Sequence, residues 1–338
     1  MRHPLLIFGL VSAASAVAFE AINFPLGAMI GPIFAVGTLA YITGESPEPG
    51  VDATDFAIML IGVVLGSQVT PEVFNHAEKW PASILLLLLT MILSLFTLGR
   101  INQQLLGMKR VSAYLAGAPG NLATAVAIAH QLDGSISQVA IYHSLRLAFL
   151  TVITPLIFYV PETPPTTLQA FGSSDFVIWI LLLAVAWLMT QVLKKLRVTT
   201  PGLLAGTIVT ASINLSEIEL INPPSFFISI AMIIFGWQVA IDVLKQGLLI
   251  LSKTIAPAVC LNILGVILAA IGAYITHVTI DLPLSDTLLG FMPGGFQVMP
   301  VVALETGADG LYVTTHHLIR VLAMGMLIPL FAYYWRRS

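Results

Sequence analysis

The sequence predicts an all-α polytopic membrane protein with about ten transmembrane helices, two broken, re-entrant Pro-Gly segments and two inverted-topology repeats. Three observations carry this prediction. Of the 338 residues, 57% are hydrophobic and only 9% are charged, apolar runs recur along the whole chain, and the second half repeats motifs of the first. A soluble globular protein has about 25% charged residues. This chain therefore has too few polar side chains to cover its own surface.

Composition also excludes several functional classes. The chain has 14 Lys and Arg against 17 Asp and Glu, a net charge of −3, which lacks the basic excess of a nucleic-acid-binding protein. The single cysteine, Cys260, excludes an internal disulfide. The sequence contains no G-x-x-x-x-G-K-[ST] phosphate loop and no spacing typical of a metal cluster or a nucleophile triad. We expect no nucleic-acid partner, no metal, no other cofactor and no enzyme activity.

Apolar runs of near-spanning length define the expected helices, since a bilayer requires roughly 17–25 residues. The first run can be read as a signal peptide ending at Ala14-Ser15-Ala16 or as an uncleaved first span, and the many spans that follow favour the span. The ten runs are 4–20, 24–42, 55–70, 81–99, 137–160, 175–193, 201–215, 225–244, 254–276 and 312–335. Two further segments, 113–132 and 288–306, contain Pro-Gly and small residues, and we expect them to re-enter without crossing.

Positive charge sets the expected orientation, because Lys and Arg accumulate on the cytoplasmic side. With ten crossings, eleven of the fourteen basic residues lie inside and only Lys79 lies outside. The eleven are Arg2, Arg100, Lys109, Arg110, Lys194, Lys195, Arg197, Lys245, Lys253, Arg336 and Arg337. If the Pro-Gly segments crossed fully, the cluster at 194–197 would lie outside. We therefore expect a multi-pass protein with both termini cytoplasmic.

An internal duplication divides the chain. Residues 117–158 align without gaps with 291–332, at an offset of 174. The matching pairs are Pro119/Pro293, Gly120/Gly294, His143/His317, Arg146/Arg320 and Pro155/Pro329. A second match pairs 66–73 with 236–243 at an offset of 170. We infer a first membrane repeat at 1–160, a Pro-rich linker at 161–174 and a second membrane repeat at 175–338. Five spans per repeat is an odd number, so the second repeat is expected to be inverted, as in many secondary transporters.

Arg146 and Arg320 are the sharpest functional signal. Each lies about nine residues into its span, and at about 1.5 Å per residue this places it close to mid-bilayer. A charge at the centre of a membrane helix costs about 2.5–3.5 kcal/mol on insertion scales. One interpretation is that both guanidiniums face a polar cavity and bind an anionic substrate. The alternative is that each pairs with an acid or with helix-end carbonyls and stabilises the fold.

His143 and His317 stand three residues before these arginines and therefore share a helix face with them. An ordinary pKa near 6.5 suits a proton-coupling role, and the alternative is a neutral histidine that hydrogen-bonds between helices.

Two Pro-Gly turns are the second signal: Pro119-Gly120-Asn121 and Pro293-Gly294-Gly295. A helix broken there would aim free N–H groups at a bound anion. The alternative is an ordinary kink or hairpin.

Further polar residues are candidates for pathway or counter-charge groups. Gln68 and Gln238 are each followed one helical turn later by an acid, Glu72 and Asp242. Such residues can instead sit at the membrane interface. Glu305 is the acid that we expect most strongly to pair with an arginine.

The P-G-x-x-x-x-x-x-x-A block, H-S-L-R at 143–146 and H-L-I-R at 317–320 resemble the bacterial AbrB-type membrane family. The resemblance covers nearly the whole chain, although Asn121 stands where the second copy has Gly295. It implies a duplicated inner-membrane protein, distinct from the small DNA-binding AbrB regulator. Members are thought to transport small molecules, carry the label ammonia monooxygenase, and are associated with regulation of gene expression.

Three functions are therefore compared. The leading one is an inner-membrane secondary transporter of a small anionic solute, an organic or amino acid, bound midway between the repeats. The second is a membrane protein that regulates gene expression without binding DNA directly, and the third is a membrane oxygenase subunit. The expected partners are the lipid bilayer, a small-molecule solute and a second copy of the chain in a homodimer.

Overall fold

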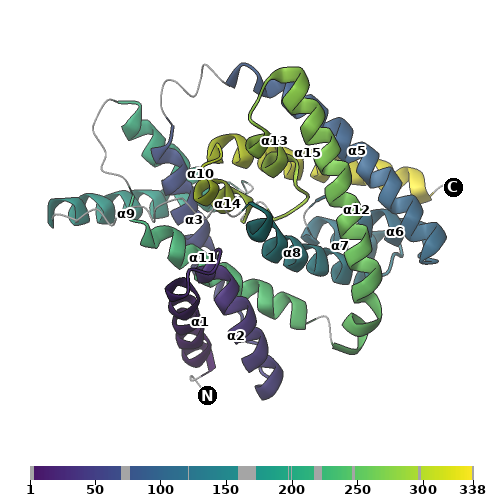
Figure 1. The fold of residues 1–338 in the computed structure, drawn as a ribbon, viewed down its shortest axis with the longest axis horizontal. Coiled ribbons are helices and arrows are strands. Elements are labelled where there is room, and N and C mark those ends of the chain that lie inside the picture. Colours follow the sequence, from purple (N-terminus) through teal and green to yellow (C-terminus); the bar gives the residue numbers. More distant parts are fainter. Residues whose placement is uncertain are drawn as a thin grey trace. The chain divides into compact units, whose positions relative to one another are not determined.

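The computed structural model describes residues 4–69, 77–120, 122–158, 173–196, 198, 200–216, 223–245, 248–295 and 298–336. All regular secondary structure in these ranges is α-helical (Figure 1). Seven helices of the described ranges are long and apolar enough to cross a membrane. The predicted class, an all-α polytopic membrane protein, is confirmed.

Each of the ten predicted spans coincides with one helix. These helices are α1 (Pro4–Ala21), α2 (Gly27–Thr43), α3 (Val51–Ser67), α5 (Trp80–Leu105), α8 (Ile136–Phe158), α9 (Ser173–Lys195), α10 (Pro201–Asn214), α11 (Phe226–Leu244), α12 (Leu248–Ile280) and α15 (Gly310–Arg336). The two Pro-Gly segments each form a pair of short helices: α6 (Arg110–Gly117) with α7 (Leu122–Gln131), and α13 (Leu284–Phe291) with α14 (Met299–Thr306). Eight residues span only about 12 Å of helix, so neither α6 nor α13 crosses a bilayer alone.

Helix bounds recur at the offset that the sequence repeat predicts. The starts of α6 and α13, Arg110 and Leu284, are 174 residues apart. The same separation holds for α2 and α10, and for α8 and α15. A common order of long and short helices in both halves supports the duplication.

Two compact units divide the chain, and each contains helices from both halves. The first unit comprises Met1–Glu78, Pro155–Ile241 and Pro300–Thr306, and the second comprises Lys79–Thr154, Asp242–Met299 and Gly307–Ser338. The units therefore do not follow the two repeats. Most of the predicted linker, 161–172, lies outside the described residues, so the boundaries of the repeats stay a prediction.

In the first unit, glycines bring α3 and α10 into close contact. A Cβ at Gly62 would lie 2.3 Å from the carbonyl oxygen of Leu203, and one at Gly66 would lie 2.5 Å from that of Thr207. The later glycine on α3 contacts the later residue on α10, so the two helices run parallel. Close packing through small residues is typical of membrane helices.

The corresponding pair, α2 and α11, also runs parallel, since Gly236 faces the Met29 carbonyl and Gly37 faces Ala240. Helix α9 relates the two pairs. Near its start, Trp179 packs edge-on against Phe227 at the start of α11, and near its end Lys194 binds Asp55 near the start of α3.

Helices α3 and α11 therefore begin at opposite ends of the first unit. Because α10 runs parallel to α3 and α2 runs parallel to α11, α2 and α3 run opposite to their counterparts in the other half, α10 and α11. This is the inverted arrangement that the odd number of spans predicts.

The second unit shows the same inversion. Helices α5 and α12 pack antiparallel, with Leu98 beside Gly265 and Thr90 beside Gly272. Helix α15 begins beside the start of α5, where His316 hydrogen-bonds to Ser83.

Helix α8 begins at the other end of α5. Asn102, in the last turn of α5, donates to the Ala113 carbonyl of α6, and the amide of Ser135, just before α8, donates to Ser112 of α6 at 2.8 Å. Helices α8 and α15 therefore run in opposite directions.

The two Pro-Gly segments are re-entrant hairpins, as predicted. Ser135 follows α7 yet hydrogen-bonds to Ser112 near the start of α6. In the second half the amide of Asp309 donates to Asp286 near the start of α13 at 3.1 Å. Each hairpin therefore leaves at the end where it entered. Both contacts join residues 23 positions apart, and their positions differ by 174.

Candidate functional site

Proline creates the break in each hairpin. Ala118 and Met292 end α6 and α13 in extended backbone, with ψ of 126° and 130°. Each precedes a proline, Pro119 or Pro293, and steric contact with the proline ring disfavours helical backbone at that position. The break frees carbonyl groups from helical hydrogen bonding, and these require partners inside the second unit.

Arg320 supplies those partners in the second hairpin. Its Nη1 donates to the carbonyl of Met292, and its Nη2 donates to the carbonyl of Gly294 at 2.6 Å. The side chain is only 3% exposed. This matches the interpretation in which an arginine stabilises the fold through backbone carbonyls.

A histidine links each arginine to its hairpin. His317 Nε2 lies 2.9 Å from the Leu289 carbonyl, and Arg320 Nη2 lies 2.6 Å from His317 Nδ1. In the first half, His143 Nε2 lies 2.9 Å from the Leu115 carbonyl. The two accepting carbonyls are 174 residues apart, so the repeat preserves the hydrogen bond as well as the residue types.

The two arginines differ in their contacts. Within the described residues, the hydrogen bond found for Arg146 runs from Nη2 to His143 Nδ1 at 3.0 Å. The counterparts of the Met292 and Gly294 carbonyls are those of Ala118 and Gly120. Among the described residues, no hydrogen bond joins the Arg146 guanidinium to either of these two carbonyls. The Arg146 side chain is 9% exposed.

Both arginines line the same two cavities. The wider cavity has a volume of about 250 Å³. Its walls are Pro119, Gly120, Leu122, His143, Ser144, Arg146, Leu147, Asp242, Pro293, Gly294, Gly295, Arg320 and Val321. The two hairpin breaks and the two oppositely running helices α8 and α15 therefore converge on it. The two guanidiniums outnumber the one carboxylate of this lining, Asp242, so together with several glycine backbones they suit a small anion.

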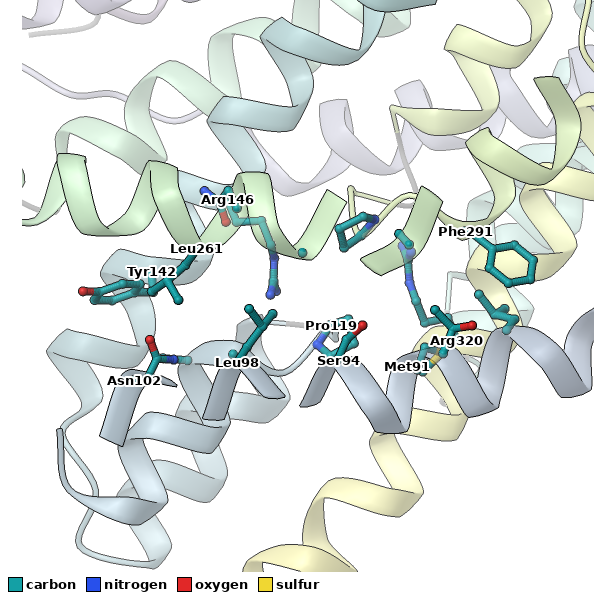
Figure 2. A pocket seen from close by; sticks show the side chains of 18 residues that line it. Met91, Ser94, Leu98, Asn102, Pro119, Tyr142, Arg146, Leu261, Phe291 and Arg320 are labelled. Atoms are coloured by element: carbon teal, nitrogen blue, oxygen red, sulfur yellow. The ribbon is translucent and has the colours of Figure 1, made fainter. Parts of the chain in front are cut away.

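A second, narrower cavity shares Pro119, Arg146, Pro293 and Arg320 with the wide one. It extends between α5, α8 and α12. Figure 2 shows Asn102 and Tyr142 at one end of this cavity and Phe291 and Arg320 at the other, with the Arg146 side chain reaching in between.

Most of the sequence-predicted binding residues line the wide cavity. The predicted pathway residues do not all lie there. Asp242 lines the wide cavity with the arginines. Gln68, Gln238 and Glu305 belong to the first unit. Glu72 and Asn121 lie outside the described residues. In the described part of the chain, no three His, Cys, Asp or Glu side chains group as metal ligands would.

Sequence reasoning missed Asn102 and Asn262, which both line the narrow cavity. Asn262 lies in the middle of an apolar run and Asn102 lies just beyond one. A lone amide in such a run is a usable signal, since buried polar groups in membranes are costly unless bonded.

Comparison with known proteins gives the family. Residues 28–336 match the family model AbrB, described as "Transition state regulatory protein AbrB". A protein of Escherichia coli K12 named "Putative regulator AbrB" is 21% identical over 344 residues, which cover 97% of this chain and 96% of that protein. "Uncharacterized protein YhjN" of Bacillus subtilis 168 is 20% identical over 348 residues, which cover 95% and 90%. The chain belongs to the AbrB family, whose relatives here are large proteins of its own length.

Proposed function

We propose that this protein is a secondary transporter of a small anionic solute, an organic or amino acid, bound in the wide cavity. One observation carries the proposal: Arg146 and Arg320 line one cavity from helices that run in opposite directions. Inverted repeats with broken helices at a central site are the plan of many secondary transporters. Two buried cations impose an electrostatic cost that an anion offsets when it binds.

The architecture supports a carrier in a second way. The hairpin tips, at Pro119-Gly120 and Pro293-Gly294, lie on the cavity together with the arginines. An anion bound there would contact backbone from both halves. Small relative shifts of the two halves would then change which side of the cavity is open, which is how carriers alternate access.

Uptake into proteoliposomes tests this function. Purified protein is reconstituted and assayed against a panel of radiolabelled monocarboxylates, dicarboxylates and amino acids, with an imposed pH gradient or membrane potential. We expect saturable uptake of at least one anion and its loss in Arg146→Gln. Unchanged uptake in both Arg146→Gln and Arg320→Gln would place the site elsewhere. Protein-free liposomes and the exposed variant His130→Ala serve as controls.

The second candidate function is regulation of gene expression without direct DNA binding. The names of the family model and of the Escherichia coli relative favour it. In this interpretation the protein acts through a partner or through the solute that it moves. Expression profiles of cells that carry the wild type, a deletion and Arg146→Gln separate the two ideas. Regulation that persists in a transport-inactive variant supports a direct regulatory role.

We place the protein in the bacterial inner membrane with both termini in the cytoplasm, because ten spans put eleven of fourteen basic residues inside. Reporter fusions at both ends, one active only in the cytoplasm and one only outside it, test the orientation. A homodimer is a further expectation, which mass measurement in detergent tests.

A further inference from the structure

The narrow cavity carries a polar pair that the anion site leaves unused. Asn102 of α5 and Asn262 of α12 both line it. The antiparallel packing of the two helices sets Leu98 beside Gly265, so Asn102, one turn after Leu98, lies at the level of residues 261–262. The two amides therefore line the cavity from the same level of the two helices, and Figure 2 draws Asn102 and Leu261 toward the same end of it.

Each amide has an atom without a partner in the described residues. Asn102 donates from Nδ2 to the Ala113 carbonyl at 2.8 Å, which fixes the orientation of its amide and leaves Oδ1 unbonded. Asn262 has an unbonded Nδ2. The two residues are only 1% and 8% exposed. One acceptor and one donor thus remain buried at this cavity, and buried polar groups of this kind normally have partners.

The cavity also has a charge preference. Arg146 lines it, and none of its described lining residues is acidic. A carboxylate is therefore favoured there, whereas the ammonium of an amino acid would enter beside a guanidinium without a counter-charge. Its free volume of about 30 Å³ holds roughly two water-sized groups. The cavity can accept a small polar substituent, while the wide cavity holds the rest of the solute.

We propose that the solute is a hydroxycarboxylate, with its carboxylate at Arg146 and its hydroxyl between Oδ1 of Asn102 and Nδ2 of Asn262. A hydroxyl fits because it both donates and accepts. It donates to the Asn102 oxygen and accepts from the Asn262 amide, so both unbonded atoms gain a partner. This inference rests on the proposed anion site and adds the class of substrate.

Asn262→Leu is the sharpest variant. Position 262 corresponds to Leu88 of the first half, 174 residues earlier, which packs against the core of the second unit. The other half therefore already carries leucine there. Cys260→Ser, an exposed change two residues away on the same helix, is the matched control. Asn102 is a poorer choice, because its amide also joins α5 to α6.

Binding of three-carbon probes to the purified full chain tests the proposal. Isothermal titration compares propionate, lactate, 3-hydroxypropionate and alanine, which share a skeleton and differ in one substituent. We expect at least one hydroxy acid to bind more tightly than propionate, by about five- to a hundredfold for two neutral hydrogen bonds, and alanine to bind more weakly. Asn262→Leu should abolish the preference, while Cys260→Ser should retain both the preference and the wild-type affinity for propionate.

The outcomes separate this inference from the function on which it rests. If carboxylates bind but wild type and Asn262→Leu show the same preference, the amides hold only water and the hydroxycarboxylate assignment is wrong. If alanine binds as tightly as lactate, the charge argument is wrong. If none of the probes binds to the folded protein and no anion is taken up by proteoliposomes, the anion site itself is refuted.

Discussion

Arg320 Nη2 lies 2.6 Å from His317 Nδ1, and this contact determines the state of the imidazole. The guanidinium can only donate, so Nδ1 accepts and carries no proton. Nε2 then carries the hydrogen and donates to the Leu289 carbonyl at 2.9 Å. The histidine is neutral in this arrangement and connects a backbone carbonyl to an arginine. A proton-coupling role would require the contact to break, so the geometry favours a positioning role.

His317→Ala should lower the free energy of unfolding by about 1–3 kcal/mol, because it removes two buried hydrogen bonds and leaves the Leu289 carbonyl unsatisfied. Thermal unfolding in detergent, followed by tryptophan fluorescence, measures the change. His130→Ala, at an exposed position on α7, should stay within about 0.5 kcal/mol of the wild type. Equal stability of the two variants would contradict the structural role of His317.

The two arginines should respond differently to the same substitution. Arg320→Gln removes charged hydrogen bonds to the Met292 and Gly294 carbonyls and should cost about 2–5 kcal/mol of stability. Arg146→Gln loses the bond to His143 and should cost less than half as much. Denaturation of both variants in the same detergent gives the comparison. If the two losses are equal, Arg320 does not have the structural role assigned to it.

Gly206→Ala should separate α3 from α10. A Cβ at Gly206 would lie 2.4 Å from the Met59 carbonyl oxygen, and backbone at that distance must move, which costs about 1–3 kcal/mol. Gly325→Ala on α15 is the matched control, since nothing lies within 4 Å of its Cβ. Alanine is the better helix former by about 1 kcal/mol, so the control should keep or slightly raise stability. A stable Gly206→Ala variant would argue against this packing.

Asp286 should make stability depend on pH. It lies outside the seven long spans, and burial raises the pKa of its carboxyl by more than the hydrogen bonds from the Asp309 amide and the Ser285 hydroxyl lower it. A raised folded-state pKa means that the stabilising contribution is complete below the ordinary value of about 3.9 and is lost as pH rises through the folded-state pKa. Asp286→Asn keeps an oxygen that can accept the Asp309 amide.

We therefore expect Asp286→Asn to be more stable than the wild type at neutral pH and to show a flatter pH profile. Unfolding measured between about pH 3.5 and 7.5 covers the transition, which starts near the ordinary Asp pKa. The exposed variant Asp133→Asn should retain the wild-type profile. If Asp286→Asn instead loses stability at neutral pH, where the wild-type carboxyl is ionised, and not at the acid end of the range, the charge itself is needed.

Much of the fold could be predicted because apolar length and Pro-Gly breaks are local properties. All ten apolar runs became helices, and both Pro-Gly segments became re-entrant pairs of short helices. The inversion also followed from counting spans. The composition of the compact units could not be predicted, because glycines such as Gly62 and Gly206 join α3 to a helix of the other half.

The site was predicted less completely. The repeat identified Arg146, Arg320 and their histidines, since scarce residues at one offset stand out in an apolar chain. The same repeat gave no reason to treat the two arginines differently. Only the geometry shows that Arg320 is bonded to the backbone of its hairpin, whereas the bond found for Arg146 in the described residues runs to His143.

The sequence by itself determined the helices, their duplication and the cationic residues, because hydropathy and periodicity act along the chain. The tertiary structure decided which helices pack together, which amide atoms of the described residues are buried without partners, and which arginine bonds to the backbone of its hairpin. Those features depend on the register between α5 and α12 and on the path of each hairpin. Both are set by contacts between residues far apart in the sequence, which no local pattern encodes.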